Sequence, residues 1–448
     1  MEQQAEKEHK ICEKVFSLAG SRDAEVIISS SESALTRFAD NVISQNVSGR
    51  STDIIIRVME SGRVGRVSIN NDGEEHLRHA VDSALAMLTA QKADSALMPL
   101  PDPVPVKENG LLYFESTASF SPADRASKIS AVAAMCASCG RTASGILDNG
   151  WSRVTVANSR GVLVSHAETE ATFSVTVRDG SAMGWAEEYV ADIGRLDFES
   201  VAGRASEKAG MARNPVEIKP GRYAVVLEPD PVANMLFFSA IYGFGGQFFL
   251  EGQSFMAGRL GQKVLGGNIT ITDNALDGPG SGMPFDFEGM PRKKVMLVEN
   301  GMAMTAVHDR RTSGKAGVSS TGHALPSPNT YGPIPSNLSL KPGGSSLEDM
   351  IKSTERGLLV TQFHYVNVLK PVSLELTGMT RNGTYLIENG RITGPVRNMR
   401  FTESVVEALG RVEAIGAKPS VTAAFFGGKF LVPPMKIRDF NFSSVTGF

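Results

Sequence analysis

The period of the hydrophobic positions changes along the chain and predicts where its helices and strands lie. Apolar residues recur every three or four positions over 1–20 and 74–92, which is typical of amphipathic helices. Between these segments, over 23–69, apolar and polar residues alternate as they do in half-buried strands. The order of a helix, several strands and a second helix predicts an N-terminal α+β domain over residues 1–95.

A proline-rich run, MPLPDPVPVKENG, follows and predicts an extended linker. Ser121 and Pro122 then begin a helix that we expect to continue to about Ser138, because serine can cap a helix whose first residue is proline. A long alternating pattern with a turn at 158–161 predicts two strands after it. These elements predict a middle α+β domain over 113–218.

Beyond Pro220-Gly221 the pattern is mostly that of strands, and we expect a larger β-rich C-terminal domain over 221–448. Two of its segments, VMLVENGMAM at 295–304 and TYLIENGRIT at 384–393, have Glu-Asn-Gly between two apolar strands. Asparagine and glycine both tolerate a positive φ, so each segment predicts a β-hairpin. The chain as a whole is therefore predicted to be α+β.

A coil rich in glycine, serine and proline covers 312–346. Compact domains rarely carry so long a coil unless it binds something or moves. Its residues Asn329, Thr330 and Tyr331 are therefore candidates for contact with a substrate or a partner.

Two further helices are predicted near the end of the chain. Ser345 and Glu348 have the spacing of a capping box, which would begin a helix that continues through Arg356. The last helix is expected over 402–415.

The most apolar part of the sequence, from Glu228 to Gly261, predicts a buried helix of about twelve residues. Asp230 and Pro231 have the character of a helix start, and the glycine pair at 245–246 would end the helix. A helix of this length spans about 18 Å, which is too short to cross a membrane.

Composition and charge exclude several classes of protein. With 448 residues, 42% of them hydrophobic, the chain is long enough for two or three folded domains. A net charge of −3 provides no general attraction to nucleic acid. Three cysteines do not make a secreted disulfide scaffold, and MEQQAEKEHK contains no apolar signal segment. We therefore expect a cytoplasmic protein that binds neither membranes nor nucleic acid.

Several groups of residues could bind metal, although none has a full set of ligands. Cys136 and Cys139 form C-x-x-C in an alanine-rich helical pattern, but no second ligand pair is near in the sequence. His76 and His79 lie three apart beside Glu75, and a solvated helix face explains them more simply.

Asp286 and Glu288 are two residues apart, and a strand would place both on one face. Together with His308, His323 and His364 they could form a metal site or an acid–base pair, although their spacing matches no helix or hairpin ligand pattern. A loop-capping role for the two carboxylates is the simpler interpretation.

Six short pieces, in order along the whole chain, give it a resemblance to the TldD/PmbA family. They are LTRFA at 35–39, ANSRG at 157–161, KPG at 219–221, FDFEGMP at 285–291, and the two Glu-Asn-Gly hairpins. The resemblance implies three domains, the last of them rich in strands. It also implies dimers in which a zinc-bearing and a zinc-free subunit enclose a cavity and cleave unfolded or peptide-like chains.

The chain departs from the family where the chemistry would be. Catalytic members carry His-Glu-x-x-x-His on the helix that matches the apolar stretch. Here Phe238 and Gly243 hold the positions of the two histidines, and Ser239 holds that of the glutamate. A further metal ligand, a cysteine near the C-terminus, is matched by AAFFGG at 423–428. A zinc site needs three protein ligands, and hydrolysis needs a general base.

The resemblance therefore implies a zinc-free subunit of the PmbA/TldE type, with no catalytic residue, metal or other cofactor of its own. Its partner would be a TldD-like subunit that holds the zinc, and its substrate an unfolded protein or peptide. Two alternatives stay open at this point: an independent peptidase with a different site, and a binding or scaffold protein with no connection to peptidases.

Overall fold

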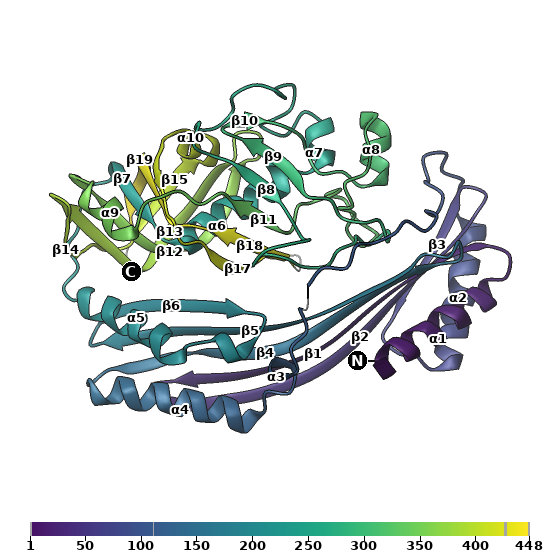
Figure 1. Cartoon of the computed structure of the whole chain (residues 1–448), viewed down its shortest axis with the longest axis horizontal. Helices are drawn as coiled ribbons and strands as arrows, with labels where there is room; N and C mark the ends of the chain where they lie inside the picture. The colour runs from purple at the N-terminus through teal and green to yellow at the C-terminus, as the bar shows by residue number, and fades with distance from the viewer. Residues whose placement is uncertain (1, 111, 425–427, 447–448) are drawn as a thin grey trace.

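The computed structural model describes residues 2–110, 112–424 and 428–446 and has the mixed helix and strand content predicted from the sequence. A long antiparallel sheet forms the base of the molecule, and the C-terminal domain lies over one of its faces (Figure 1). None of the helices within these residues is both long and apolar enough to cross a membrane.

The long sheet has six strands in the order β3-β2-β1-β4-β5-β6. Its strands are β1 (Asp23–Ala39), β2 (Val42–Glu60), β3 (Arg63–Ile69), β4 (Thr142–Asn158), β5 (Leu163–Asp179) and β6 (Ala182–Val190). Strand β1 pairs with β2 on one side and with β4 on the other, from Glu25↔Asn158 to Phe38↔Gly145. The strands before and after the proline-rich linker thus belong to one continuous sheet.

Helices cover the face of this sheet that is turned away from the C-terminal domain. They are α1 (Glu2–Ala19), α2 (Glu74–Ala90), α3 (Glu115–Ala118), α4 (Pro122–Ser138) and α5 (Phe198–Met211), with a short 3-10 turn η1 (Ile193–Arg195). The two-residue period of β5 explains the division: Phe173 and Val175 lie in the core beneath α4 and α5, whereas Glu168 and Glu170 face the other way.

The C-terminal domain contains two sheets. The first has the order β10-β9-β8-β11-β18-β17, with β8 (Ile271–Asp273), β9 (Val295–Glu299), β10 (Met302–Ala303), β11 (Leu338–Leu340), β17 (Ser420–Ala424) and β18 (Gly428–Val432). The second has the order β12-β7-β19-β15-β13-β14, with β7 (Gly221–Leu227), β12 (Arg356–Lys370), β13 (Glu375–Glu388), β14 (Arg391–Pro395), β15 (Met399–Ser404), β16 (Val412–Ile415) beside β19, and β19 (Met435–Val445). Because β12 also pairs with β13, five of these strands close into a barrel.

Short helices connect and cover these sheets: α6 (Pro229–Phe238), α7 (Gly246–Leu250), α8 (Arg310–Ala316), α9 (Leu347–Lys352) and α10 (Val405–Gly410), and a π-helix η2 (Ser239–Gly243) that continues α6. The largest hydrophobic core of the protein lies here and includes most of α6. Both Glu-Asn-Gly hairpins are confirmed, with positive φ at Asn300, Gly301, Asn389 and Gly390.

Two helix predictions in this domain are wrong. The segment expected to be one helix over 402–415 contains the end of β15, the six-residue α10, and β16, because its first residues still pair with β13 and its last residues pair with β19. The capping box is formed by Ser346 and Asp349, not by Ser345 and Glu348, and its helix ends at Lys352.

Two other boundaries also differ from the prediction. The apolar helix begins at Pro229 rather than at Asp230, whose carboxylate accepts a hydrogen bond from the Phe363 backbone instead of capping. The predicted coil over 312–346 is shorter, because Asp309 and Thr312 form a capping box that begins α8, and 338–340 pair as β11.

Candidate functional site

The resemblance matches the family's metal-binding helix to α6, which we call the motif helix. This helix ends in the π-turn η2. A hydrogen bond from the Phe244 N–H to the Ser239 carbonyl, 2.9 Å long, spans five residues. Phe238 and Gly243, which hold the first and last positions of the motif, are also five residues apart. The π-turn therefore has the same period as the interval between these two positions. Turns of this kind are frequent at functional sites.

The side chains at the motif positions do not fit a metal ion. A Cβ atom added at Gly243 would lie 2.5 Å from Cε1 of Phe255, so the ring of Phe255 fills the space that a larger side chain would need. The buried hydroxyl of Ser239 donates to the Met235 carbonyl at 2.9 Å. Phe238 packs edge-on against Phe237, with ring centroids 5.1 Å apart. Phenylalanine and glycine carry no side-chain ligand atom, and a serine hydroxyl is not among the usual ligands of zinc.

The region matched to the cysteine ligand is described only in part. Ala423 lies in β17, whereas Phe425, Phe426 and Gly427 lie outside the described residues. Within the part of the chain that the structure describes, no three His, Cys, Asp or Glu side chains are grouped so that they could hold a metal ion.

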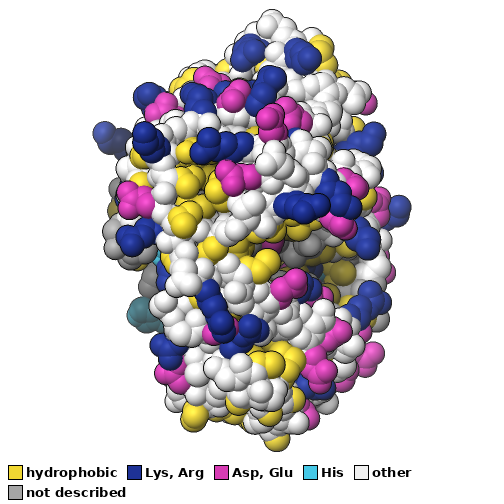
Figure 2. Space-filling model, turned by 90° about the vertical axis from the view of Figure 1, so that its left-hand side faces the viewer, with side chains coloured by type: hydrophobic (Ala, Val, Ile, Leu, Met, Phe, Trp, Pro, Cys, Tyr) yellow, Lys and Arg dark blue, Asp and Glu magenta, His cyan; other side chains and the backbone are white. Residues whose placement is uncertain are grey.

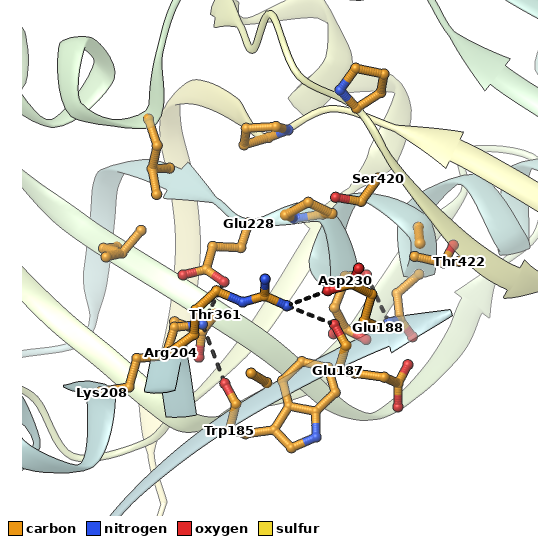
Figure 3. Close-up of a pocket in the computed structure, with 18 of the residues that line it drawn as sticks. Trp185, Glu187, Glu188, Arg204, Lys208, Glu228, Asp230, Thr361, Ser420 and Thr422 are labelled. Atoms are coloured by element: carbon orange, nitrogen blue, oxygen red, sulfur yellow. Dashed lines mark hydrogen bonds and ion pairs between the residues drawn. The ribbon is translucent and has the colours of Figure 1, made fainter. Parts of the chain in front are cut away.

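A cleft of about 1160 Å³ opens between the long sheet and the C-terminal domain. Figure 2 shows the molecule hollowed between these two halves, and Figure 3 shows the residues around the cleft. The motif helix forms one wall through Asp230, Ala233, Asn234 and Phe237. Strand β6 and helix α5 form the opposite wall. The rest of the cleft is lined by residues of α9, β12, β13 and β17.

Two sheet edges meet at this cleft. Strand β6 is the last strand of the long sheet, and β17 is the last strand of one C-terminal sheet. Each is hydrogen-bonded to a neighbouring strand on one side only among the described residues, and both contribute residues to the cleft, including Trp185, Glu187, Ser420 and Thr422. An edge strand carries backbone N–H and C=O groups that can pair with another extended chain.

The sheet face beside the cleft carries three carboxylates, Asp148, Glu170 and Glu187, whose charged forms are disfavoured by burial. They come from three adjacent strands and lie on the face turned towards the C-terminal domain. Burial, followed by the charge of Glu170, raises the pKa of Asp148 to about 7. Burial also raises the pKa of Glu170 and of Glu187.

Asp230 adds a carboxylate from the motif helix to the same cleft. Burial raises its pKa to about 7, although the hydrogen bond from the Phe363 N–H opposes the shift. Elsewhere in the cleft, ion pairs join Lys208 to Glu228 at 2.7 Å and Arg204 to Glu188 at 3.2 Å, as Figure 3 shows. The cleft therefore combines neutralised pairs with carboxylates that favour cationic groups.

An ion pair connects the two halves next to this acidic face. Lys429 of β18, which is 3% exposed, reaches Glu168 of β5 at 2.8 Å. Burial alone would raise the pKa of Glu168, but the nearby His166 and Lys429 outweigh burial and lower this pKa to about 2. The pair joins the C-terminal domain to the sheet, and the charge of Lys429 also opposes, without cancelling, the rise in the pKa of Glu170.

The predicted contact residues Asn329, Thr330 and Tyr331 form a turn beside the motif helix rather than in the cleft. Asn329 closes the turn through hydrogen bonds with the Tyr331 N–H and the Gly332 carbonyl. Tyr331 is 43% exposed and lies near Tyr242 of the π-turn. Their contact with a substrate or partner stays a prediction.

The second group of candidates forms structural networks. Asp286 lies in a turn, not a strand, and accepts backbone N–H groups of Glu288, Met290 and Ala324 at 2.9–3.0 Å, which is the loop-capping arrangement. Burial raises the pKa of both Asp286 and Glu288.

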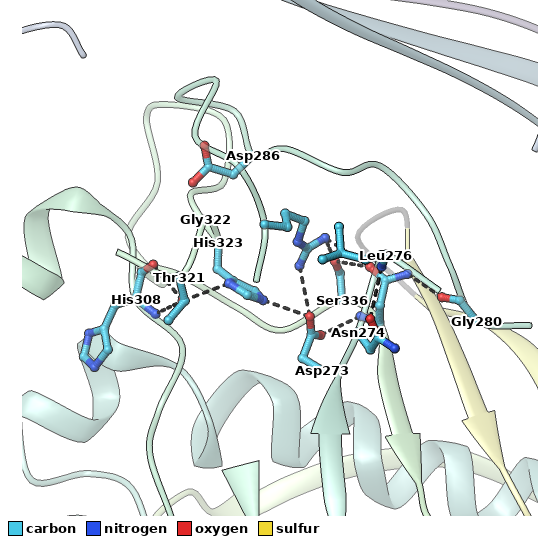
Figure 4. A network of polar contacts seen from close by, with 12 residues as sticks. Asp273, Asn274, Leu276, Gly280, Asp286, His308, Thr321, Gly322, His323 and Ser336 are labelled. Atoms are coloured by element: carbon cyan, nitrogen blue, oxygen red, sulfur yellow. Dashed lines mark hydrogen bonds and ion pairs between the residues drawn. The ribbon is translucent and has the colours of Figure 1, made fainter. Parts of the chain in front are cut away.

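The histidines are also used internally, as Figure 4 shows. His323 contacts Asp273 at 2.8 Å and Thr321 at 2.9 Å, and both His323 and Asp273 are completely buried at the side chain. Nδ1 of His308 contacts the Thr312 hydroxyl, and His364 lies on the exposed side of β12 beside Arg381. These side chains do not converge on one accessible site.

Sequence reasoning did not identify the carboxylates of the cleft. The signal was present in β5, where Glu168 and Glu170 occupy two successive polar positions of the alternating pattern, which puts both on one face. Their functional importance depends on which surface covers that face, and the sequence pattern does not contain this information.

Three models of one family match the chain in order. Those of the PmbA/TldA metallopeptidases cover residues 24–88 with domain 1, 115–213 with the central domain and 220–444 with the C-terminal domain. A metalloprotease of Methanothermobacter thermautotrophicus is 26% identical over 283 residues, 60% of this chain and 61% of that protein. The chain thus spans about three fifths of the length of that relative.

Two relatives match over almost their full length. The metalloprotease PmbA of Escherichia coli O157:H7 is 25% identical over 464 residues, which cover 97% of each chain. The crystal structure of TldE from Thermococcus kodakarensis superimposes with a TM-score of 0.87 at 21% identity, covering 97% of this chain and 99% of that one, which shows a shared fold. On the family models and this common architecture, the chain belongs to the PmbA/TldD family of metallopeptidase-like proteins.

Proposed function

We propose that this chain is the zinc-free subunit of a heteromeric TldD-type metallopeptidase, and that it helps to enclose and hold an unfolded or peptide substrate. The observation that carries the proposal is the packing of the motif helix. The π-turn is present, but Gly243 is packed against Phe255 and Ser239 is bonded to its own helix. These residues do not fit zinc, so the chain needs a relative that supplies it.

The known relatives support this assignment. The chain shares its fold with TldE, and its sequence relatives include metalloproteases named PmbA and TldD. A family that contains both kinds of chain is consistent with a division of labour, in which one subunit binds the metal and the other shapes the chamber.

The cleft provides a means of holding substrate. An extended peptide can add to a sheet edge through main-chain hydrogen bonds, which do not depend on the peptide's sequence. The edges of β6 and β17 border the cleft, and its apolar and charged walls, including Trp185 and Phe237, can receive side chains. When bound in the partner, zinc would polarise the scissile carbonyl. The residues of this chain would restrict the substrate to an extended form.

A cleft-filling variant tests the proposal. Ala233 lines the cleft from α6, and Ala233→Trp would place an indole in the space meant for the peptide. Ala134→Trp on the exposed face of α4 is the matched control. Each variant is mixed with the zinc-bearing relative from the same genome, and complex formation and cleavage of an unfolded protein are measured.

We expect Ala233→Trp to form the complex but to raise the KM for the unfolded substrate at least several-fold, whereas the control behaves as the unmodified chain. The proposal is wrong if the unmodified chain neither binds the zinc-bearing relative nor changes its cleavage rate. Equal KM values for the two variants would refute the role of the cleft.

A further inference from the structure

The cleft between the long sheet and the C-terminal domain carries more negative than positive charge. Five carboxylates line it among the described residues, namely Glu187, Glu188, Glu207, Glu228 and Asp230. The basic side chains in the same lining are Arg204 and Lys208, and each already forms an ion pair, with Glu188 and Glu228 respectively. The other three carboxylates therefore have no basic partner on the described walls of the cleft.

Two of these three carboxylates, Glu187 and Asp230, face the cleft from opposite walls. Glu187 is on β6, and Asp230 is in the first turn of α6. Burial raises the pKa of Asp230, and the charges of Glu187 and Glu228 raise it further, whereas Lys208 opposes them more weakly. Oδ2 of Asp230 accepts the Phe363 N–H at 3.0 Å, and no described residue donates to Oδ1. A cation between Glu187 and Asp230 would be attracted from both walls.

A polar group on β17 also lacks a partner, independently of the carboxylates. Thr422 lines the cleft, and its hydroxyl is buried with no hydrogen-bond partner among the described residues. Buried hydroxyl groups in native proteins are nearly always hydrogen-bonded, so an occupant of the cleft would supply what is missing. The other β17 residues of the lining, Ser420, Val421 and Ala423, bring no positive charge to the cleft.

The cleft suits a basic side chain better than a metal ion. Trp185 and Phe237 provide apolar surface beside the carboxylates. Lysine and arginine combine an apolar stem, which packs on such surface, with a charged head. Within the described residues no three His, Cys, Asp or Glu side chains are grouped as metal ligands. The volume of about 1160 Å³ also exceeds that of most small-molecule pockets, which favours a longer ligand such as a peptide.

We propose that the cleft selects peptides with a basic residue, whose ammonium or guanidinium group is held between Glu187 and Asp230. This inference rests on the part of the proposed function that places an extended peptide in the cleft. It adds a charge preference to the sequence-independent main-chain contacts of a sheet edge, because opposite charges that meet away from bulk water favour one ligand over another.

Binding of labelled peptides to the purified full chain tests the inference. Three peptides of about ten residues, built from threonine and alanine, differ only at a central lysine, glutamine or glutamate. All three are acetylated and amidated and carry an uncharged fluorophore, so the central residue has the only charge. A fourth peptide, with central glutamine and a free amino terminus, tests a terminal ammonium. Fluorescence anisotropy gives each Kd at pH 8, above the pKa of about 7 of Asp230.

The variants are Glu187→Gln, Asp230→Asn and the charge reversal Glu187→Lys. The matched control is Glu75→Gln, because Glu75 is exposed on α2 at the far end of the sheet (Figure 1). Because the Glu187 side chain is open to the cleft, its replacement should leave the fold intact.

We expect the unmodified chain and Glu75→Gln to bind the lysine peptide about tenfold more tightly than the glutamine peptide. Glu187→Gln and Asp230→Asn should lose most of this preference, and Glu187→Lys should bind the glutamate peptide more tightly than the lysine peptide. Equal Kd values for the lysine and glutamine peptides in the unmodified chain would overturn the inference and leave the subunit assignment standing. Tighter binding of the peptide with the free amino terminus than of the lysine peptide would also overturn it.

The reverse combination separates the two proposals as well. A lysine preference that depends on Glu187, in a chain that does not change cleavage by the zinc-bearing relative, would support the charge preference and refute the subunit assignment. If none of the four peptides binds, either to the chain alone or to the chain mixed with the zinc-bearing relative, both proposals are wrong.

Discussion

Restoring the metal motif should not restore a metal site. The variant Phe238→His, Ser239→Glu, Gly243→His recreates the family's pattern in sequence, but the surrounding packing opposes it. A Cβ at Gly243 would lie 2.5 Å and 3.1 Å from two atoms of the Phe255 ring, so Phe255 would have to move. Overpacking of this kind costs about 1–3 kcal/mol.

Ser239 adds a second penalty. It is 1% exposed, and replacing its hydroxyl by a carboxylate buries a charge beside the Met235 carbonyl, which is itself an acceptor. An unpaired buried polar group costs about 1–3 kcal/mol and a charge costs more, so the combined loss should reach about 3–6 kcal/mol. A loss of this size is comparable with the total stability of many domains.

The assay combines urea denaturation of the purified chain with measurement of bound zinc. We expect a lower urea midpoint for the triple variant and less than one tenth of a zinc ion per chain. Adding Phe255→Ala to Gly243→His should recover part of the loss caused by Gly243→His, giving a non-additive double-mutant cycle. A triple variant with an unchanged midpoint and one zinc per chain would refute the reasoning.

Three further predictions concern the ion pair, the buried carboxylate and a hairpin. Lys429→Met leaves Glu168 with only His166 beside it within the described residues and should cost about 2–3 kcal/mol by urea denaturation, below the value for a fully buried pair because Glu168 is 20% exposed; an unchanged midpoint would contradict the role of this ion pair in joining the two halves. Burial raises the pKa of Asp230 in the folded chain to about 7, above its ordinary value of 3.8, so the stability that this carboxyl contributes in its protonated form is lost as the pH rises through 7. The urea midpoint of Asp230→Asn should therefore rise relative to that of the unmodified chain as the pH is raised from 5 to 8. A difference between the two midpoints that does not change with pH would contradict the raised pKa of Asp230. Gly301→Ala should destabilise the first hairpin by at least about 1 kcal/mol, because Gly301 has φ +81° and a Cβ there would lie 2.5 Å from the Leu265 carbonyl oxygen; full stability in the same assay would count against this packing.

Local signals in the sequence predicted much of the fold. The two Glu-Asn-Gly turns identify both hairpins because only a few residue types accept a positive φ at two successive positions. Ser121 and Pro122 likewise mark the beginning of α4. In contrast, the segment at 402–415 alternates between strand and helix within a few residues, and its apolar spacing fits either structure.

Long-range pairing was the part that the pattern could not supply. The contact of β1 with β4 joins segments more than a hundred residues apart across the proline-rich linker. The alternating pattern of each strand does not indicate which other strand it pairs with. The cleft follows from this pairing, because it places Glu187 opposite Asp230. The sequence showed that the motif residues are replaced. Only the structure showed that the ring of Phe255 fills the space that a histidine at position 243 would need.

The central claim is that this chain completes a peptidase whose metal is held by another subunit. The most direct test titrates the purified chain into a fixed amount of the zinc-bearing relative from the same genome and follows both cleavage of an unfolded protein and the zinc content of each subunit. We expect cleavage to rise to a plateau at one chain per relative and the zinc to stay with the relative. Stoichiometric zinc in this chain, together with chelator-sensitive cleavage by the chain alone, would contradict it.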